Sequence, residues 1–323
     1  MGAILFRSIN GAGYDRIQIR YLQAGQSFRI LGSSLKAKLD KGVAVLEIGY
    51  FNGKFISLED AVIPIDERGH QFGDGVYEVI RVYNGKPFMM DEHLQRLIKS
   101  AEAIKLPLTD GIEELRSLIN EGITKAGLAD CSVYLQVTRG IAARLHLFPD
   151  VPVSISMTIR PAKALPIEMR EKGANAIILE DERWSNCYIK SLNLLPNILA
   201  KQIASEADCF EAILVRDGVV TEGTSSNVFY VKDQNIYTAP LTRHILPGIT
   251  RIVVKEISKA LYIPFNEEHF APGKLTQADE VFITSTTSEV LPIVKIDGQA
   301  IGTGEPGEIT TRIYEQFQAK LIE

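Results

Sequence analysis

Lys190 lies in a mostly uncharged stretch, WSNCYIKSLNLL at 184–195, between a predicted strand and a predicted helix. A lysine in this position is either solvated or desolvated. Desolvation disfavours the ammonium form, lowers the lysine pKa and frees the amine to form a Schiff base with a carbonyl compound. Solvated surface lysines are far more common, so Lys190 indicates covalent chemistry only if suitable partners accompany it.

Glu222, in the segment TEGTSSN at 221–227, is the first candidate partner. A carboxylate facing the pyridine nitrogen of pyridoxal 5′-phosphate would keep that nitrogen protonated, which makes the ring an electron sink. The alternative is a solvated glutamate in a turn. The hydroxyl residues at 224–226 favour a polar site over that alternative.

Two turns and one arginine could hold a phosphate. The segment ILPGITR at 245–251 has a Pro-Gly turn that places Ile249 and Thr250 at a helix N-terminus, where backbone N–H groups favour anions. The segment TSTTS at 284–288 is a second turn rich in hydroxyl groups, and Arg96 lies on a predicted helix. Each feature alone is more often an ordinary cap or turn. Together they could form a phosphate site without a Walker motif, which this sequence lacks.

Arg144 and His146 alternate with apolar residues in the segment VTRGIAARLHLFP at 137–149. In an extended loop, residues two apart face the same way, so both side chains could bind one substrate carboxylate. A surface loop with a salt bridge explains the same pattern. Tyr77 is equally compatible with a core position and with a phenol donor in a cleft, and the residues alone leave both choices open.

Composition excludes several classes of protein. The 323 residues are 46% hydrophobic and 23% charged, which is typical of a globular protein large enough for two domains. A net charge of -5 argues against a nucleic-acid partner, and no segment approaches the unbroken run of about 18 apolar residues that a membrane span needs. The three widely spaced cysteines fit neither a disulfide framework nor a zinc site and indicate the cytoplasm. The five histidines lack metal-ligand spacing, so no metal is expected.

The elements that must position these residues fall into two expected domains. We predict an N-terminal extension at 1–45, a small α+β domain at 46–161, a linker at 162–166 and a large cofactor-binding domain at 167–323. Helices are expected near 91–104, 111–126, 196–207, 250–261 and 305–321. Strands are expected near 45–50, 76–82, 132–139, 153–161, 176–180, 211–216, 227–231 and 279–284.

Six segments, in order, resemble the fold-type IV, or class IV, pyridoxal-phosphate aminotransferases. They are RGHQFGDGVYE at 68–78, YLQVTRG at 134–140, IKSLN at 189–193, TEGTSSN at 221–227, ITR at 249–251 and TSTTSE at 284–289. The resemblance runs from about residue 45 to the C-terminus, and the likeness to the members that act on D-amino acids is close. It implies a two-domain α+β or α/β fold, with a smaller N-terminal domain and a larger C-terminal domain built on a β-barrel-like core.

The resemblance also implies a role for each candidate residue. Lys190 would form the Schiff base and move the proton, and Glu222 would face the pyridine nitrogen. The remaining cofactor-binding residues would be Arg96, Ser225, Leu246, Ile249, Thr250, Ser285 and Thr286. Those that bind substrate would be Tyr77, Arg144, His146 and Thr287, with the Arg144 loop reaching in from the second subunit of a homodimer.

Within this family, the Arg144-x-His146 pair is expected to mark enzymes that act on D-amino acids. We therefore expect a cytoplasmic ping-pong transaminase whose partners are small amino and 2-oxo acids, moving the amino group of D-alanine to 2-oxoglutarate to give pyruvate and D-glutamate. The alternatives are a branched-chain L-amino-acid aminotransferase and an aminodeoxychorismate lyase. A catalytically silent binding protein is disfavoured because lysine, glutamate and phosphate site occur together.

Overall fold

A computed structural model describes residues 27–29, 36–40, 43–45, 47–109 and 111–322 of the chain. Its contacts divide the protein into two compact units. Unit 1 comprises Met1–Met90 and Leu106–Ala162, and unit 2 comprises Asp91–Lys105 and Lys163–Glu323. The segment Asp91–Lys105, which contains nearly all of the helix expected near 91–104, thus groups with unit 2, whereas the sequence predicts it as part of the N-terminal domain.

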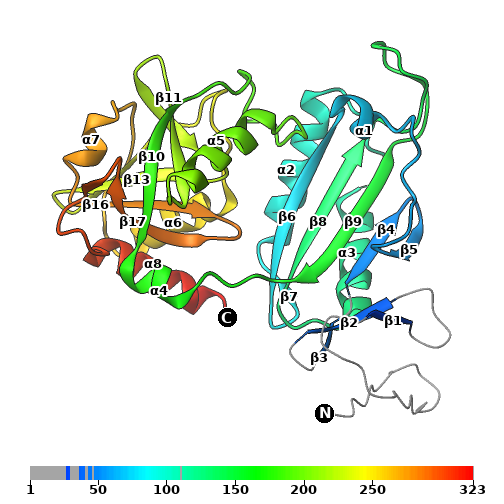
Figure 1. The fold of residues 1–323 in the computed structure, drawn as a ribbon, viewed down its shortest axis with the longest axis horizontal. Helices are drawn as coiled ribbons and strands as arrows, with labels where there is room; N and C mark the ends of the chain where they lie inside the picture. Colours follow the sequence, from blue (N-terminus) through cyan, green and yellow to red (C-terminus); the bar gives the residue numbers. More distant parts are fainter. Residues whose placement is uncertain (1–26, 30–35, 41–42, 46, 110, 323) are drawn as a thin grey trace. The chain divides into compact units, whose positions relative to one another are not determined.

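Unit 1 is built on an antiparallel six-stranded sheet with the order β5-β4-β9-β8-β6-β7. Figure 1 shows its long central strands β6, β8 and β9 side by side. The strands are β4 (Ile48–Phe51), β5 (Lys54–Ser57), β6 (Gly75–Tyr83), β7 (Lys86–Pro87), β8 (Cys131–Thr138) and β9 (Ser154–Pro161). Along β6 and β8, buried residues alternate with half-buried ones, because successive side chains of a strand point to opposite faces.

Two helices complete unit 1. Helix α3 (Ile112–Ala126) lies against β9 and β4, with its apolar face at Leu115, Ile119 and Ile123 buried, and Gly127 ends it in the left-handed conformation. The short α1 (Arg68–Phe72) was not predicted from the sequence. Three short strands, β1 (Ser27–Arg29), β2 (Lys36–Asp40) and β3 (Val43–Val45), form a separate antiparallel sheet in a region where the sequence shows no long period.

Unit 2 contains a mixed sheet of nine strands in the order β12-β11-β10-β17-β16-β13-β14-β15, with β18 paired to β17. The strands are β10 (Ala174–Glu180), β11 (Glu211–Arg216), β12 (Val219–Gly223), β13 (Asn227–Lys232), β14 (Asn235–Thr238), β15 (Phe265–Glu267), β16 (Glu280–Ser285), β17 (Glu289–Ile296) and β18 (Gln299–Ala300). The helices are α2 (Met90–Ala103), α4 (Ile167–Lys172), α5 (Leu195–Glu206), α6 (Ile249–Ala260), α7 (Gly273–Thr276) and α8 (Glu308–Lys320). Figure 1 shows β10, β17, β16 and β13 in the body of this unit.

The connection between β12 and β13 requires the sheet of unit 2 to curl. These strands are the first and sixth in the sheet, yet only residues 224–226 join them. Five strand spacings in a flat sheet would amount to about 24 Å. The connecting chain can span at most about 14 Å. The sheet must therefore bend into an open barrel, which places the segment that carries Glu222 where the two strands meet.

Apolar side chains are buried on both faces of the sheet of unit 2. Phe229 of β13 and Phe282 of β16 stack with their ring centroids 4.7 Å apart. On the opposite face of the same strands, Val228 and Ile283 join a cluster of buried aliphatic side chains. Among the described residues, no helix is long and apolar enough to cross a membrane.

Candidate active site

The tight connection between β12 and β13 is held by a buried carboxylate on the neighbouring strand. Glu211 of β11 is 1% exposed, and its Oε1 accepts hydrogen bonds from the backbone N–H and the hydroxyl of Thr224. Its Oε2 accepts from the Ser226 hydroxyl at 2.8 Å. A side chain at Gly223 would clash with Ser226, so the turn requires glycine there. Between these anchors, Ser225 is exposed.

Glu222 precedes this turn and is almost completely buried, at 4% exposure. Its Oε1 accepts from Arg183 Nη1 at 2.6 Å, and its Oε2 accepts from Asn227 Nδ2 at 3.0 Å. The Leu246 N–H lies 3.2 and 3.1 Å from the two oxygens. Burial raises the pKa of Glu222, while the Arg183 guanidinium and the Leu246 N–H oppose that shift.

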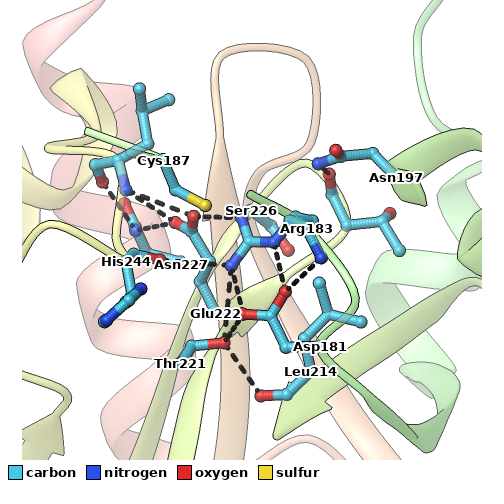
Figure 2. Close-up of polar contacts among 12 residues, drawn as sticks. Asp181, Arg183, Cys187, Asn197, Leu214, Thr221, Glu222, Ser226, Asn227 and His244 are labelled. Carbon is cyan, nitrogen blue, oxygen red and sulfur yellow. Dashed lines mark hydrogen bonds and ion pairs between the residues drawn. The ribbon is translucent and has the colours of Figure 1, made fainter. Parts of the chain in front are cut away.

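Arg183 links Glu222 to a second buried carboxylate, as Figure 2 shows. Its Nε and Nη2 donate to Asp181 Oδ1 at 2.8 Å and Oδ2 at 2.9 Å, a bidentate pair. The Thr221 hydroxyl also donates to Asp181 Oδ2, at 2.9 Å. Burial alone would raise the pKa of Asp181, but hydrogen bonds and attraction from Arg183 outweigh burial and lower it.

Arg216 and His244 extend this cluster. Arg216 Nη1 donates to His244 Nδ1 at 2.7 Å, and its Nη2 lies 3.1 Å from Asp181 Oδ1. Desolvation and the Arg216 charge lower the pKa of His244, which agrees with an imidazole nitrogen that accepts rather than donates. Burial raises the pKa of Cys187 to about 11, so this thiol stays protonated and is a poor nucleophile.

The Pro-Gly turn at 247–248 starts α6 as the sequence predicts. The N-cap Gly248 has no side chain to accept from the first N–H groups of the helix, which contains Ile249 and Thr250. A side chain at Gly248 would clash with Asn227 Oδ1. From α2, Arg96 Nη1 donates to Pro247 O at 2.8 Å. Arg96 and the α6 N-terminus therefore meet at one turn, an arrangement that favours an anion.

The second hydroxyl turn follows β16. Ser285 Oγ accepts from the Ser288 N–H at 2.9 Å and lies 3.3 Å from Thr287 Oγ1. Ser285 and Thr286 are half-buried, whereas Thr287 is exposed. No hydrogen bond among the described residues joins this turn to Gly248. The structure does pair Thr284, at the base of the turn, directly with Asn227 on β13.

Lys190 is half-buried in the connection between β10 and α5. Its N–H donates to Ser100 Oγ of α2 at 3.1 Å. The same connection is tied to the segment before α6, because the Tyr188 N–H donates to Arg243 O at 3.3 Å. Since α2 also carries Arg96, one helix contacts both the Lys190 segment and the anion-favouring turn. Leu246 is half-buried in that turn region, and its carbonyl accepts from Asn227 Nδ2 at 3.0 Å.

In unit 1, Arg144 and His146 are both exposed and both lie against Phe72. The Arg144 guanidinium lies 4.6 Å from the Phe72 ring centroid, and the His146 ring lies 5.7 Å from it. Arg68 Nη1 fixes the loop between them by donating to Leu145 O at 2.6 Å. Residues two apart in this loop thus do share one side, as the sequence analysis expected.

Tyr77 is half-buried on β6 and stacks on Tyr134 of β8, with ring centroids 5.5 Å apart. Burial raises the pKa of Tyr134 to about 12, and its hydroxyl donates to Gln136 at 2.7 Å. Tyr77 is therefore not a residue of the hydrophobic core. It lies on the face of the sheet opposite the fully buried Val76 and Ile80.

The residues that support the candidate site are not evident from the sequence. Asp181, Arg183 and Glu211 follow or begin strands, where charged residues usually mark an exposed strand end. Phe72 lies in the motif at 68–78, which gives no sign that its ring contacts Arg144 and His146. A charged DER segment between two predicted buried stretches was the available signal for Asp181 and Arg183, and it equally fits a surface turn.

Comparisons with known proteins define the family. The sequence profile of the amino-transferase class IV family matches residues 75–296. D-alanine aminotransferase of Bacillus licheniformis is 46% identical over 276 residues, which cover 84% of this chain and 96% of the relative. The branched-chain amino acid aminotransferase of Escherichia coli has a similar structure, with a TM-score of 0.79 and 29% identity over 84% of this chain and 93% of that one.

A second solved structure, the T.th. branched-chain amino acid aminotransferase with pyridoxamine 5′-phosphate, has a TM-score of 0.79 and 29% identity, over 85% of this chain and 93% of that one. The chain belongs to the class IV aminotransferases. The family and fold class predicted from the six motifs are confirmed, and the protein is a pyridoxal-phosphate-dependent transferase.

The residues of unit 2 fit this cofactor. Thr284 Oγ1 is buried and has no hydrogen-bond partner among the described residues. Because Thr284 and Asn227 are directly opposite on adjacent strands, their side chains share a face, the one on which Asn227 binds Glu222 and touches the Gly248 turn. A buried hydroxyl without a partner costs about 1–3 kcal/mol. It is therefore well suited to a site that a polar ligand completes.

Proposed function

We propose that this protein is a D-amino-acid transaminase that moves the amino group of D-alanine to 2-oxoglutarate and yields pyruvate and D-glutamate. The observation that carries the proposal is the 46% identity to D-alanine aminotransferase over 96% of that relative's length. Arg144 and His146, which share the Phe72 ring, support it as two cationic or hydrogen-bonding groups that could bind one carboxylate.

The cofactor would be held by the groups already described in unit 2. Arg96, Ile249 and Thr250 would bind its phosphate with Ser285 and Thr286, Ser225 would lie near it, and Leu246 would pack on its ring. Glu222 would face its pyridine nitrogen. When bound, the cofactor supplies a carbonyl for the amino group and a protonated ring that withdraws electrons.

The chain's own residues would position the substrate and move the proton. Lys190 Nζ would bond to the cofactor at rest and then accept the proton from the substrate α-carbon and return it. Tyr77, Arg144 and His146 would hold the substrate α-carboxylate, with Thr287 beside them. Fixing the carboxylate decides which face of the α-carbon presents its hydrogen to Lys190, and so sets the chirality of the substrate.

The test is a side-by-side assay of purified protein with D-alanine, L-alanine, L-leucine and aminodeoxychorismate. We expect turnover of D-alanine with 2-oxoglutarate, with pyruvate and D-glutamate as products. The similarity to branched-chain aminotransferase structures makes L-leucine the relevant competitor. Faster turnover of L-leucine, or elimination from aminodeoxychorismate, would contradict the D-specific assignment.

We also propose that the enzyme is a homodimer in which the loop at 141–149 completes the partner's site. The loop exposes Leu145, Leu147 and Phe148, at 66%, 83% and 59%, and large exposed apolar groups of this kind mark interaction surfaces. Helix α5 exposes a second apolar stripe at Leu195, Ile198, Leu199 and Ile203. A dimer that buried both would remove this apolar surface from water.

Mixing Lys190→Ala with Arg144→Ala, assayed at a D-alanine concentration low enough that each variant alone has little activity, tests the shared site. In a dimer of one Lys190→Ala chain and one Arg144→Ala chain, a loop acting on the partner gives one intact site. Random re-association should then recover up to about a quarter of the wild-type activity, since half the dimers are mixed. No recovery in demonstrably mixed dimers would place the loop at its own chain's site, and a monomer in sedimentation would contradict the dimer itself.

Two further proposals concern the chain's organisation. Residues 1–45 lie outside the catalytic fold, 46–161 form the small domain except for 91–105, which groups with the large domain at 167–323, and 162–166 link the two. In support, contacts divide the chain between Ala162 and Lys163. A variant that begins at Glu47 should retain activity, and its loss would assign 1–45 to the enzyme. The cytoplasm is the proposed location, in keeping with three free cysteines.

A further inference from the structure

Glu222 belongs to a buried ion cluster with Arg183 and Asp181. Transaminase chemistry itself requires only the Glu222 carboxylate of these three charges. Figure 2 shows that Arg183 is hydrogen-bonded to Asp181 on one side and to Glu222 on the other. We infer that Arg183 is a positioning residue that keeps the Glu222 carboxylate ionised and oriented for the cofactor, and that Asp181 holds Arg183 for this purpose. The inference rests on the proposed role of Glu222.

The geometry leaves Arg183 one orientation. Its Nε and Nη2 edge is occupied by Asp181, and Nη2 also lies within 3.2 Å of His244 O. Only Nη1 is directed to Glu222, at 2.6 Å. The Asp181 carboxylate also accepts from the Arg183 backbone N–H, at 3.1 Å, so the residue is anchored at both ends of its side chain. A guanidinium held in this way presents a fixed cation to one carboxylate oxygen.

The environment makes such a cation necessary. The side chains of Arg183 and Glu222 are 6% and 5% exposed, so water contributes little to stabilising a charge on Glu222. Burial favours the neutral carboxylic acid, which could not serve as counter-ion to a protonated pyridine. Arg183 supplies the opposite charge at hydrogen-bond distance, and Asn227 and Leu246 supply neutral donors. The surrounding donors therefore favour the ionised form of Glu222.

The two oxygens of Glu222 are not equivalent. Oε1 accepts from the Arg183 cation, whereas Oε2 accepts only from the neutral amide of Asn227 and the Leu246 N–H. The cation withdraws more electron density from Oε1. Oε2 is consequently the more basic oxygen and the better acceptor for a further donor. Besides Arg183 and Glu222, the titratable and charged groups at this position are Asp181, Arg216, His244 and Cys187.

A purely structural role is the competing explanation, since breaking any buried ion pair destabilises a protein. The double variant Asp181→Asn/Arg183→Gln separates the two. It removes both members of the bidentate pair together, so that neither is left without the other. Arg216 loses its ion pair with Asp181 but keeps its hydrogen bonds to the backbone carbonyls of residues 181 and 183. It leaves Glu222 buried without its cation. A structural role predicts altered stability alone, whereas a positioning role also predicts a protonated Glu222.

The experiment is infrared difference spectroscopy of the holoenzyme across neutral pH, with Glu222→Gln as the reference that assigns the carboxyl band. Wild type should show an ionised Glu222, and the double variant should show the C=O band of a protonated carboxyl. The double variant should also lose about 10- to 100-fold in kcat with little change in KM, the size seen when supporting partners of a site are removed. The single variant Arg183→Lys keeps the positive charge, so its Glu222 should show the band of an ionised carboxylate, as in wild type.

Glu267→Gln is the matched control, since it removes the carboxylate paired with the buried Arg251 of the same unit and does not contact Glu222. It should leave the Glu222 band and kcat unchanged. A protonated band in wild type, or an ionised one in the double variant, would overturn the inference. If the double variant does not fold, Arg183→Gln alone makes the same comparison, because Asp181 keeps Arg216 as its ion-pair partner. The measurement needs no turnover, so a failure of the transaminase assay would be recognised separately.

Discussion

The residues proposed to bind the cofactor and those proposed to bind the substrate are held in different ways. In unit 2, Glu222 is 4% exposed and receives hydrogen bonds from three other segments of the chain. In unit 1, Arg144 and His146 are exposed and rest on one aromatic ring, and the loop between them is fixed mainly through its backbone. The first arrangement fixes charge and geometry together, while the second fixes the position of a loop.

This difference has a consequence for substitutions. A change in the buried cluster leaves other charges without partners, so it should affect both folding and chemistry. A change on the exposed loop removes a contact to substrate and little else. The reaction type should therefore tolerate little variation in unit 2, whereas substrate choice should be adjustable in unit 1. Substitutions in each unit test this difference.

Lys190→Ala should reduce transamination at least about 1000-fold, because it removes both the covalent attachment and the group that moves the proton. Steady-state assay with D-alanine measures the loss, and the visible absorbance of the bound cofactor should change with it. Lys255→Ala is the control, since Lys255 is exposed and paired with Glu267. A Lys190→Ala enzyme with near-normal turnover would exclude this lysine from the chemistry.

Asp181→Asn should lower the free energy of unfolding by about 3–5 kcal/mol, because it withdraws the main partner of a buried guanidinium. Urea denaturation measures the change. Asp279→Asn is the comparison, since Asp279 also pairs with a cation, through Lys232, but is 47% exposed and should matter much less. Equal losses in the two variants would contradict the contrast between buried and exposed charge.

The same carboxylate should give this stability a defined pH dependence. The pKa of Asp181 is lower in the folded protein than its ordinary value of 3.8, so the unfolded chain binds the proton more readily. Its contribution is present above the ordinary value and is lost as pH falls through the folded pKa. The stability advantage of wild type over Asp181→Asn should therefore shrink on acidification below 3.8. A constant advantage would mean that the lowered pKa contributes nothing to folding.

Local sequence patterns predicted the longer helices and eight of the strands, but they missed β17 and six shorter strands of the two larger sheets. Apolar residues at helical spacing placed α3 and α6 within a residue of their bounds, because burial of one helix face is the dominant signal in both. The helix expected near 91–104 runs from Met90 to Ala103. The short α1, α4 and α7 were missed, since four to six residues give no detectable period.

Only those residues of the candidate site that lie in sequence motifs could be predicted. Lys190, Glu222 and the Gly248 turn stand in recognisable strings, whereas Arg183 and Glu211 act through contacts at the ends of neighbouring strands. Glu211 and Ser226 are 15 residues apart and meet just beyond the pair of Ile213 and Gly223 in the β11–β12 ladder. Such a contact depends on strand register, which residue spacing alone does not specify. The role of Phe72 was hidden for a similar reason, because its neighbours Arg144 and His146 come from a distant loop.

Arg144→Ala should raise KM for D-alanine about 10- to 100-fold, the size expected when a hydrogen bond between charged groups is lost. The absorbance of the bound cofactor and the stability should stay close to wild type, since Arg144 is exposed. Arg160→Ala, an exposed arginine elsewhere in unit 1, serves as control. An unchanged KM would remove Arg144 from the substrate site, and a changed cofactor spectrum would contradict the separation between the two groups of residues.

Phe72→Ala should have the smallest effect, raising KM for D-alanine roughly 2- to 5-fold, which corresponds to the loss of an exposed cation–π contact. Phe72→Tyr keeps the ring face and should leave KM unchanged. Arg144 and His146 contact the same ring. The two variants therefore show whether the aromatic face of Phe72 positions these side chains. If Phe72→Ala raised KM as much as Arg144→Ala, the loop would depend on the ring for its whole conformation, and the Arg68 hydrogen bond to Leu145 O would be insufficient to hold it.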